Sequence, residues 1–312
     1  MTQPDVSVII VSWNVRDYLR ACLQSLLAGA GREQLEIIVV DGASADGSAA
    51  LVAAEFPEVR LLAQTTNVGF PRGNNIGLAA AQGRYLFLLN PDTVIQPNTI
   101  TTLLAYMEEH PAVGVAGAQL RYPDGRVQSS RRRFPTFWTG VFESTWLEPL
   151  APRGLLARYR VDDAPDDAVT AVDWVMGACL FVRRAAYAAV GGMDEAYFMY
   201  SEELDWCRRM RDGGWQVHYV PTTYVIHHEG KSSEQAVTAR HVNFQRAKLR
   251  YFRKFHGPQT AGVLRLLLLA NYAWQLLLEG AKGVVGHRRA LRRQRVAAYW
   301  AVLKTGLPPA GY

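Results

Sequence analysis

The sequence contains three cysteines, and their spacing suggests no disulfide or metal-binding pair. Cys22, Cys179 and Cys207 lie far apart with no CxxC spacing, which indicates neither a disulfide framework nor a zinc site. We therefore expect a protein of a reducing compartment. The start of the chain also lacks a signal-peptide pattern, because Asp5 precedes a short apolar run that is more typical of a first strand.

Two glycine-rich nucleotide-binding motifs are also missing. No GxGxxG follows the first apolar run, and no GxxxxGK[ST] occurs anywhere in the chain. The sequence therefore indicates neither a Rossmann dinucleotide site nor a P-loop.

Acidic residues are almost absent from the last quarter of the chain. Residues 240–312 contain 14 Lys and Arg but a single acid, Glu279, whereas residues 1–239 contain 20 basic and 27 acidic residues. The tail thus carries +13 and the rest −7. Because the positive charge is confined to the tail and the front is mildly acidic, we expect no nucleic-acid partner.

Strand and helix patterns alternate through the first 120 residues. Apolar runs at 6–11, 36–40, 60–63, 85–89 and 113–118 predict strands, of which 6–11 and 85–89 are expected to be buried, and helical patterns lie between them. This alternation predicts an α/β fold with a doubly wound, mainly parallel sheet. We expect a catalytic domain over 1–235, with an irregular insertion at about 121–171 that borders the site, and a helical region over 236–312.

Polar residues gather where the predicted strands end. Carboxyl ends of parallel strands share one edge of a sheet, where ligands bind. An aspartate and an amide two residues apart, as in Asn90-Pro91-Asp92, can hold a divalent cation and the oxygens of a diphosphate, although each such cluster can also be ordinary turn chemistry. Asp41 has an acceptor-only carboxylate suited to a nucleobase N–H, or to a turn or helix cap. The residues of this edge are Asn14, Asp41, Ser44, Asn67, Asn90 and Asp92.

Three carboxylates lie close together in Ser201-Glu202-Glu203-Leu204-Asp205, at the start of a predicted helix. A partly buried carboxylate with acidic neighbours has a raised pKa and can act as a general base. Favourable charge in the first turn of a helix is the alternative.

Two histidines, His227 and His228, end a later predicted strand. Imidazole suits manganese-type sites that also use an aspartate, although such histidines are often structural.

Seven segments in collinear order make the sequence recognisable: SVIIVSWN, VVDGASADGS, NVGFPRGNN, YLFLLNPDT, WVMGACLFVRR, GGMDEAYFMYSEELDWCRR and IHHEGKSS. Together they resemble glycosyltransferase family 2, within it the bacterial rhamnosyltransferase-like branch, over residues 6–256. The resemblance implies a GT-A fold, a nucleotide-diphosphate sugar donor, a divalent cation (Mg²⁺ or Mn²⁺) and inversion at the anomeric carbon.

The resemblance also implies roles for particular residues. Asp41 matches the aspartate that reads the base, and Asp92 matches the metal ligand of the DxD motif, whose first position is Asn90 here. Glu203 matches the catalytic base, with Glu202 and Asp205 as alternatives, and His227 or His228 matches the histidine of the metal site. The remaining expected donor contacts are Asn14, Ser44, Asn67, Asn74 and Asn90.

The expected function is transfer of a sugar, with rhamnose from dTDP-rhamnose suggested by the family, to a hydroxyl of a cell-surface glycan or lipid-linked acceptor. Two rivals remain. A sugar-phosphate nucleotidyltransferase would need a glycine-rich triphosphate loop, and strand one ends in Ser-Trp-Asn instead. A catalytically inactive sugar-nucleotide-binding protein would not need the acidic cluster.

The tail suggests a location on the inner face of the bacterial cytoplasmic membrane. Its apolar stretch, 264–278, is interrupted by Arg265, Asn271 and Gln275, so we do not expect it to span the bilayer. With the arginines that follow, it is typical of a basic amphipathic segment on an anionic surface. A helical cap on the catalytic domain or a homodimer interface is the alternative.

Overall fold

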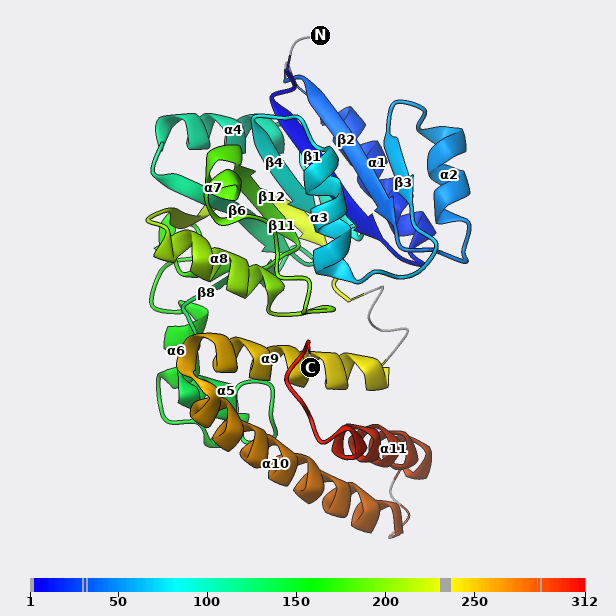
Figure 1. Ribbon diagram of the computed structural model, residues 1–312, viewed down its shortest axis with the longest axis vertical. Helices are drawn as coiled ribbons and strands as arrows, with labels where there is room; N and C mark the ends of the chain where they lie inside the picture. Colours follow the sequence, from blue (N-terminus) through cyan, green and yellow to red (C-terminus); the bar gives the residue numbers. More distant parts are fainter. Residues whose placement is uncertain are drawn as a thin grey trace. The chain divides into compact units, whose positions relative to one another are not determined.

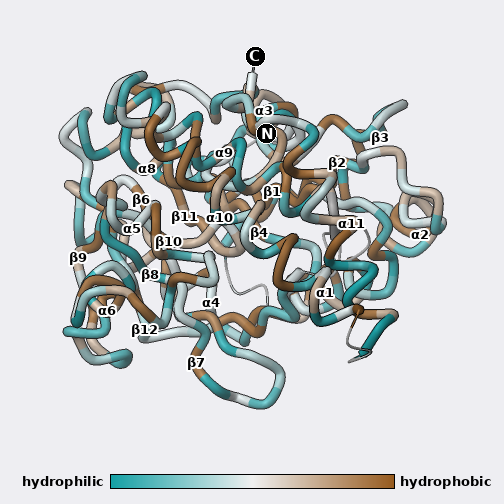
Figure 2. The backbone as a smooth tube through the Cα atoms, turned by 90° about the horizontal axis from the view of Figure 1, so that it is seen from below, coloured by the Kyte–Doolittle hydropathy of each residue, from teal (hydrophilic) through white to brown (hydrophobic). Residues whose placement is uncertain are grey.

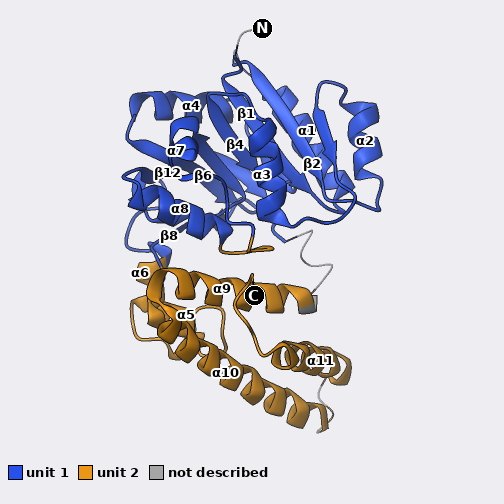
Figure 3. Ribbon diagram, in the orientation of Figure 1, with its two compact units in different colours: residues 1–134, 160–195, 202–232 blue, residues 135–159, 196–201, 233–312 orange. Residues whose placement is uncertain are grey.

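The computed structural model describes residues 3–29, 31, 33–230, 237–284, 286 and 288–311. The chain divides into two units (Figure 3): an α/β unit made of residues 1–134, 160–195 and 202–232, and a helical unit made of residues 135–159, 196–201 and 233–312. The domain boundary expected near residue 235 falls outside the described residues. Part of the expected insertion, residues 135–159, belongs to the helical unit.

Ten strands of the first unit form one sheet (Figure 1). They are β1 (Val6–Ser12), β2 (Leu35–Asp41), β3 (Arg60–Ala63), β4 (Tyr85–Leu89), β5 (Thr93–Ile95), β6 (Val113–Arg121), β7 (Val127–Gln128), β9 (Thr170–Val172), β11 (Cys179–Arg183) and β12 (Gln216–His227). The main order is β3-β2-β1-β4-β11-β6-β12-β5, with β7 beside β6 and β9 beside β12. Two further strands, β8 (Arg131–Arg132) and β10 (Trp174–Val175), pair with each other.

The first four strands of the sheet form a parallel block, as predicted. β1, β2, β3 and β4 run parallel, with Ser12 opposite Asp41 at the shared carboxyl edge. β11 enters antiparallel between β4 and β6, and β5 pairs antiparallel with β12. These antiparallel neighbours bring residues from the second half of the unit to the edge formed by the first half.

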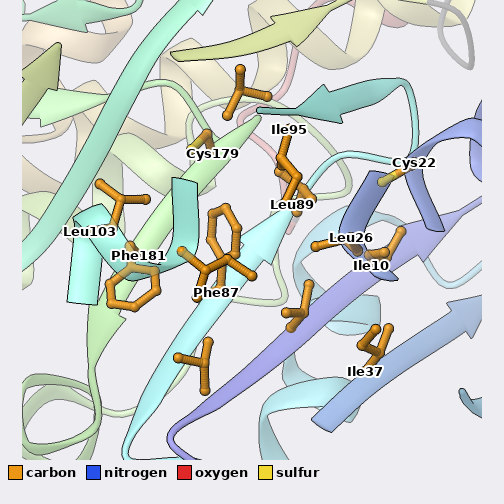
Figure 4. Close-up of a cluster of buried hydrophobic side chains, with 14 of the residues drawn as sticks. Ile10, Cys22, Leu26, Ile37, Phe87, Leu89, Ile95, Leu103, Cys179 and Phe181 are labelled. Atoms are coloured by element: carbon orange, nitrogen blue, oxygen red, sulfur yellow. The ribbon is translucent and has the colours of Figure 1, made fainter. Parts of the chain in front are cut away.

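Both faces of the sheet are covered by helices. α1 (Arg16–Ala28), α2 (Ser48–Glu55) and α4 (Thr99–Glu109) bury apolar side chains with residues such as Ile10 and Phe87 of the strands (Figure 4). α3 (Phe70–Ala80) packs closely on β1 at Ile9. A Cβ added to Gly77 of this helix would lie 2.4 Å from the Ile9 side chain. α7 (Arg184–Val190) and α8 (Glu202–Asp212) complete the helices of this unit.

The second unit is helical. It contains α5 (Phe137–Phe142), the short 3₁₀ helix η1 (Glu148–Leu150), most of α6 (Leu155–Arg160), α9 (Val237–His256), α10 (Pro258–Val284) and α11 (Arg289–Thr305). α10 packs against α5, α9 and α11. Hydrophobic and hydrophilic segments alternate along these helices (Figure 2), as packing of one face requires.

Among the described helices, α10 is long and apolar enough to cross a membrane, by length and composition only. It passes this test although Arg265, Asn271 and Gln275 interrupt its apolar sequence. The expectation that it does not span the bilayer stays a prediction.

Candidate active site

The first part of the site is a hydrogen-bonded loop pair beyond β1 and β2. The Asn14 N–H donates to Ser44 Oγ over 2.9 Å, and the Ala45 N–H donates to Asn14 Oδ1 over 2.7 Å. Asn14 and Ala43 have φ values of 53° and 59°. Left-handed backbone at a residue such as alanine is strained, and such strain is concentrated at functional sites. The loops are therefore held together in a defined shape at the sheet edge.

Asp41 lies at the base of this loop pair. Its side chain is buried, and Oδ2 accepts a hydrogen bond from the Ser44 N–H over 2.9 Å. Oδ1 is also buried and has no hydrogen-bond partner. A buried carboxylate oxygen left without a donor is costly, so the geometry favours a ligand N–H as its partner.

The two asparagines of the third loop have different positions. Asn67 Oδ1 accepts from the Gly69 N–H and lies 3.6 Å from where a Cβ on Gly42 would be, which places Asn67 beside the Asp41 loop. Asn74 is buried within α3, where its side chain donates to the Phe70 carbonyl. Asn67 thus joins the edge, whereas the described contact of Asn74 is internal to its helix.

Asp92 and His227 meet because β5 pairs with β12. Thr93 is opposite His227 in the register, and the His228 N–H donates to the Asp92 carbonyl. This pairing places His227 Nε2 3.4 Å from Asp92 Oδ1 and 3.4 Å from Asn90 Nδ2, and both His227 and Asp92 are buried. The sequence predicted all three residues, and the structure brings them together.

The hydrogen bonds around His227 assign its tautomer. Gln128 donates from Nε2 to Glu229 over 2.9 Å, so its Oε1 accepts from His227 Nδ1, 2.8 Å away. In the neutral ring His227 Nε2 then carries the lone pair, 3.4 Å from both Asp92 Oδ1 and Asn90 Nδ2. A histidine whose other nitrogen is held in this way is the usual arrangement at metal centres.

The pair fits a divalent cation. Two neighbouring ligands that are each about 2.1 Å from one ion in octahedral geometry lie about 3.0 Å apart, which is close to the 3.4 Å between Asp92 Oδ1 and His227 Nε2. A carboxylate with a neutral imidazole suits Mn²⁺ or Mg²⁺. Within the described part of the chain, no group of three His, Cys, Asp or Glu side chains could complete a cage, so the remaining ligands would be water or substrate oxygens.

The other histidine is packed elsewhere. The ring of His228 lies against the ring of Tyr18 in α1, with centroids 5.0 Å apart. Of the two predicted candidates, the geometry therefore favours His227 as the metal ligand.

The acidic cluster opens α8 after two residues in left-handed backbone, Tyr200 and Ser201, with φ values of 73° and 63°. Gly177 approaches this helix start, since a Cβ on it would lie 3.6 Å from Glu203 Cβ. The next residue, Ala178, accepts at its carbonyl from the Asn90 N–H over 3.1 Å. The loop before β11 therefore links the acidic helix start directly to the edge that carries Asn90 and Asp92.

Glu202 and Glu203 have different environments. Burial, and then the charge of Glu203, raise the pKa of Glu202 well above its ordinary value of 4.5. Burial also raises the pKa of Glu203, but backbone N–H donors that include Gly177 favour its ionised form. Each side chain has one buried oxygen without a hydrogen-bond partner. The backbone donors around Glu203 thus favour the ionised form that a general base requires.

Comparison with known proteins now identifies the family. The model of Glycosyl transferase family 2 matches residues 7–163, just over half of the chain. The chain belongs to glycosyl transferase family 2. Within that family it falls in the rhamnosyltransferase-like branch, by its similarity to curated rhamnosyltransferases.

Two curated relatives and one solved structure show the extent of the similarity. The N-acetylglucosaminyl-diphospho-decaprenol L-rhamnosyltransferase of Mycobacterium tuberculosis is 32% identical over 72% of this chain and 76% of its own. Rhamnosyltransferase WbbL of Escherichia coli is 27% identical over 72% of this chain and 83% of its own. The mannosyltransferase PcManGT from Pyrobaculum calidifontis, solved with GDP-Man and Mn²⁺, has a TM-score of 0.57 at 16% identity and covers 98% of this chain and 88% of that one. This family 2 transferase therefore has the GT-A fold.

In this family 2 transferase, Asp205 is engaged in packing. It is fully buried, and its Oδ1 accepts from Arg209 Nε over 2.7 Å. Arg209 also donates to the Val190 and Gly192 carbonyls. This arrangement attaches α8 to the end of α7, which favours a structural role for Asp205 over that of a base.

The residues that orient the site could not be recognised in the sequence. Gln128 is buried in the short strand β7, and its role depends on the contact with His227 across the sheet. Gly177 and Ala178 act through backbone position alone. No local pattern marks such residues, because each depends on a partner far away in the chain.

Proposed function

We propose that this protein is an inverting glycosyltransferase that transfers L-rhamnose from dTDP-rhamnose to a hydroxyl of a lipid-linked or glycan acceptor. The observation that carries the proposal is the facing pair Asp92 and His227, joined through Asn90 and Ala178 to the start of α8. The sugar and the lipid-linked acceptor rest on the printed activity of the Mycobacterium tuberculosis relative.

The first unit supplies the donor site. The buried Oδ1 of Asp41 accepts an N–H of the nucleobase, and the loop pair of Asn14 and Ser44, with Asn67 beside it, contacts the nucleoside. Asn90 orients the diphosphate next to Asp92. Asp92 and His227 would hold the divalent cation, which would supply positive charge to offset the charge developing on the departing nucleotide.

Glu203 acts as the general base. It takes the proton of the acceptor hydroxyl, whose oxygen attacks the anomeric carbon from the face opposite the nucleotide. The bond from that carbon to the phosphate oxygen breaks, and its electron pair leaves with the nucleoside diphosphate. A single displacement of this kind inverts the configuration, and one carboxylate is enough, unlike in a hydrolase that uses two.

The location that fits this reaction is the inner face of the cytoplasmic membrane. The basic region 240–312 would contact anionic lipid peripherally, close to a lipid-linked acceptor. Homodimerisation through the same region is the alternative.

Nucleotide release from a panel of activated sugars, measured with an acceptor and a divalent cation present, tests the proposal. We expect dTDP release from dTDP-rhamnose that depends on the acceptor, and a product of inverted configuration by NMR. A sugar-phosphate nucleotidyltransferase would instead form pyrophosphate from a nucleoside triphosphate and a sugar phosphate. An inactive binding protein would bind donors without release. Either result would overturn the proposal.

A further inference from the structure

The helical unit exposes most of the large apolar side chains that the structure leaves in contact with solvent. Of the fourteen exposed large hydrophobic residues described, eleven belong to this unit. They are Trp138, Trp146, Leu150, Phe198, Val263, Leu266, Leu267, Trp274, Leu277, Val284 and Trp300. Such a concentration on one part of a protein marks an interaction surface.

The outward side of α10 forms a continuous apolar stripe. Its members recur at helical spacing over about 30 Å, and all of them are exposed. The stripe consists of Val263, Leu266, Leu267, Ala270, Trp274, Leu277, Ala281 and Val284. No charged or polar side chain interrupts it, which is the opposite of the pattern for a helix that faces water.

The inward side of α10 is committed to protein contacts. The hydroxyl of Tyr272 is 3.3 Å from Gln245 Nε2 of α9, and its ring packs on Tyr299 of α11 at 5.7 Å. Glu279 is buried and forms ion pairs with Arg292 of α11 and Lys282. A helix with this polar inner side cannot be surrounded by lipid, because the groups would lose their partners. α10 can therefore present only its stripe to a bilayer.

A tryptophan from the expected insertion extends the stripe sideways. The ring of Trp146, which precedes η1, lies 6.4 Å from the ring of Trp274, and both are exposed. Tryptophan is enriched at the boundary between the hydrocarbon and the headgroups of a membrane. The two indoles thus mark the depth at which such a surface would lie.

The positive charge that follows α10 favours an anionic partner. Arg288, Arg289 and Arg293 at the start of α11 are exposed, and none of them meets a carboxylate among the residues described. The one acid of residues 240–312, Glu279, is already paired. A region of net charge +13 would repel a second copy of itself, whereas it complements an anionic surface.

We propose that the α10 stripe, with Trp146, lies in the headgroup boundary of an anionic bilayer, with α10 parallel to the membrane plane. This proposal rests on the peripheral membrane location proposed above and states which residues make the contact. α10 and residues near η1 provide the apolar contact, and the arginines of α11 add the preference for anionic lipid. The catalytic residues of the first unit take no part in it.

Vesicle flotation of the full chain tests this surface, with phosphatidylcholine vesicles compared with vesicles that also contain phosphatidylglycerol. We expect binding to the anionic vesicles that weakens as salt rises. The double substitution Leu266→Asn/Leu277→Asn should lower the partition coefficient at least about tenfold. Val127→Asn/Val169→Asn, at exposed apolar positions of the first unit, is the matched control and should bind like the wild type.

A second variant, Arg289→Gln/Arg293→Gln, should reduce the preference for anionic over neutral vesicles while it keeps the stripe. Nucleotide release with soluble substrates should stay at the wild-type level in all of these variants, which separates failure of the surface from failure of the transfer site. Equal vesicle binding by the wild type and the leucine double variant would overturn the proposal. So would a wild-type dimer that binds no vesicles and becomes monomeric in that variant.

Discussion

Asp92 and His227 face each other, with Asp92 Oδ1 and His227 Nε2 3.4 Å apart. A carboxylate oxygen and an imidazole nitrogen are both ligands of divalent cations. The hydrogen bond from His227 Nδ1 to Gln128 keeps the ring in the orientation that makes this contact. The proposed metal site thus depends on three residues, of which Asp92 and His227 would contact the ion.

We expect His227→Ala and Asp92→Ala to lose cation-dependent donor binding in titration calorimetry with Mn²⁺. Gln128→Leu should weaken Mn²⁺ affinity about 10- to 100-fold, since a positioning residue acts only through the ligand it orients. His228→Ala is the control, because its ring packs on Tyr18, and should titrate like the wild type. Loss of cation dependence in His228→Ala but not in His227→Ala would contradict the assignment.

At the scale of elements, the start of α8 places two glutamates in a buried setting. The pKa of Glu202 is well above its ordinary value of 4.5 because of burial and the charge of Glu203. The folded state therefore holds more protons than the unfolded state in the pH range above 4.5, so this residue makes the free energy of unfolding fall as pH rises through that range.

Glu202→Gln should remove this fall in the free energy of unfolding, because the amide does not ionise. We expect a higher free energy of unfolding than the wild type at neutral pH and little difference near pH 4. Urea unfolding followed across pH measures it. Glu58→Gln, at an exposed position, is the control and should leave the free energy of unfolding unchanged at both pH values. A gain for Glu202→Gln that is the same at both pH values would argue against burial of an ionised carboxyl as the cause.

The sequence predicted the parallel strands well and the antiparallel ones poorly. The predicted strands at 60–63 and 85–89 match β3 and β4 residue for residue. β4 is a buried apolar run between turns, whereas β3 is a partly exposed strand at the end of the sheet. The insertion of β11 between β4 and β6, and the pairing of β5 with β12, depend on contacts distant in sequence. The same limit applies to the site: Asp92 and His227 carried chemical signals, whereas Gln128 and Gly177 carried none.

At the scale of the whole molecule, the three cysteines report on global folding. Cys22, Cys179 and Cys207 are free and buried, and burial raises the pKa of each thiol to about 12. They lie in α1, β11 and α8 of the first unit. A thiol with so high a pKa, shielded from solvent, is a poor nucleophile.

We therefore expect no reaction of the native protein with a thiol reagent at pH 8 on the timescale in which the denatured chain reacts at all three positions. Labelling should proceed at the rate of unfolding as denaturant is added. Rapid labelling of one thiol under native conditions, located by mass spectrometry, would show that its helix or strand opens separately from the rest.

The central claim concerns Glu203, which is joined to the donor edge through Gly177, Ala178 and Asn90. Single-turnover nucleotide release by Glu203→Gln, with donor affinity measured in parallel by calorimetry, tests it most directly. The amide has nearly the shape of the carboxylate but cannot take a proton, so we predict a fall in the transfer rate of about 10²- to 10⁴-fold with unchanged donor affinity. Turnover close to the wild-type rate in this variant would contradict the account.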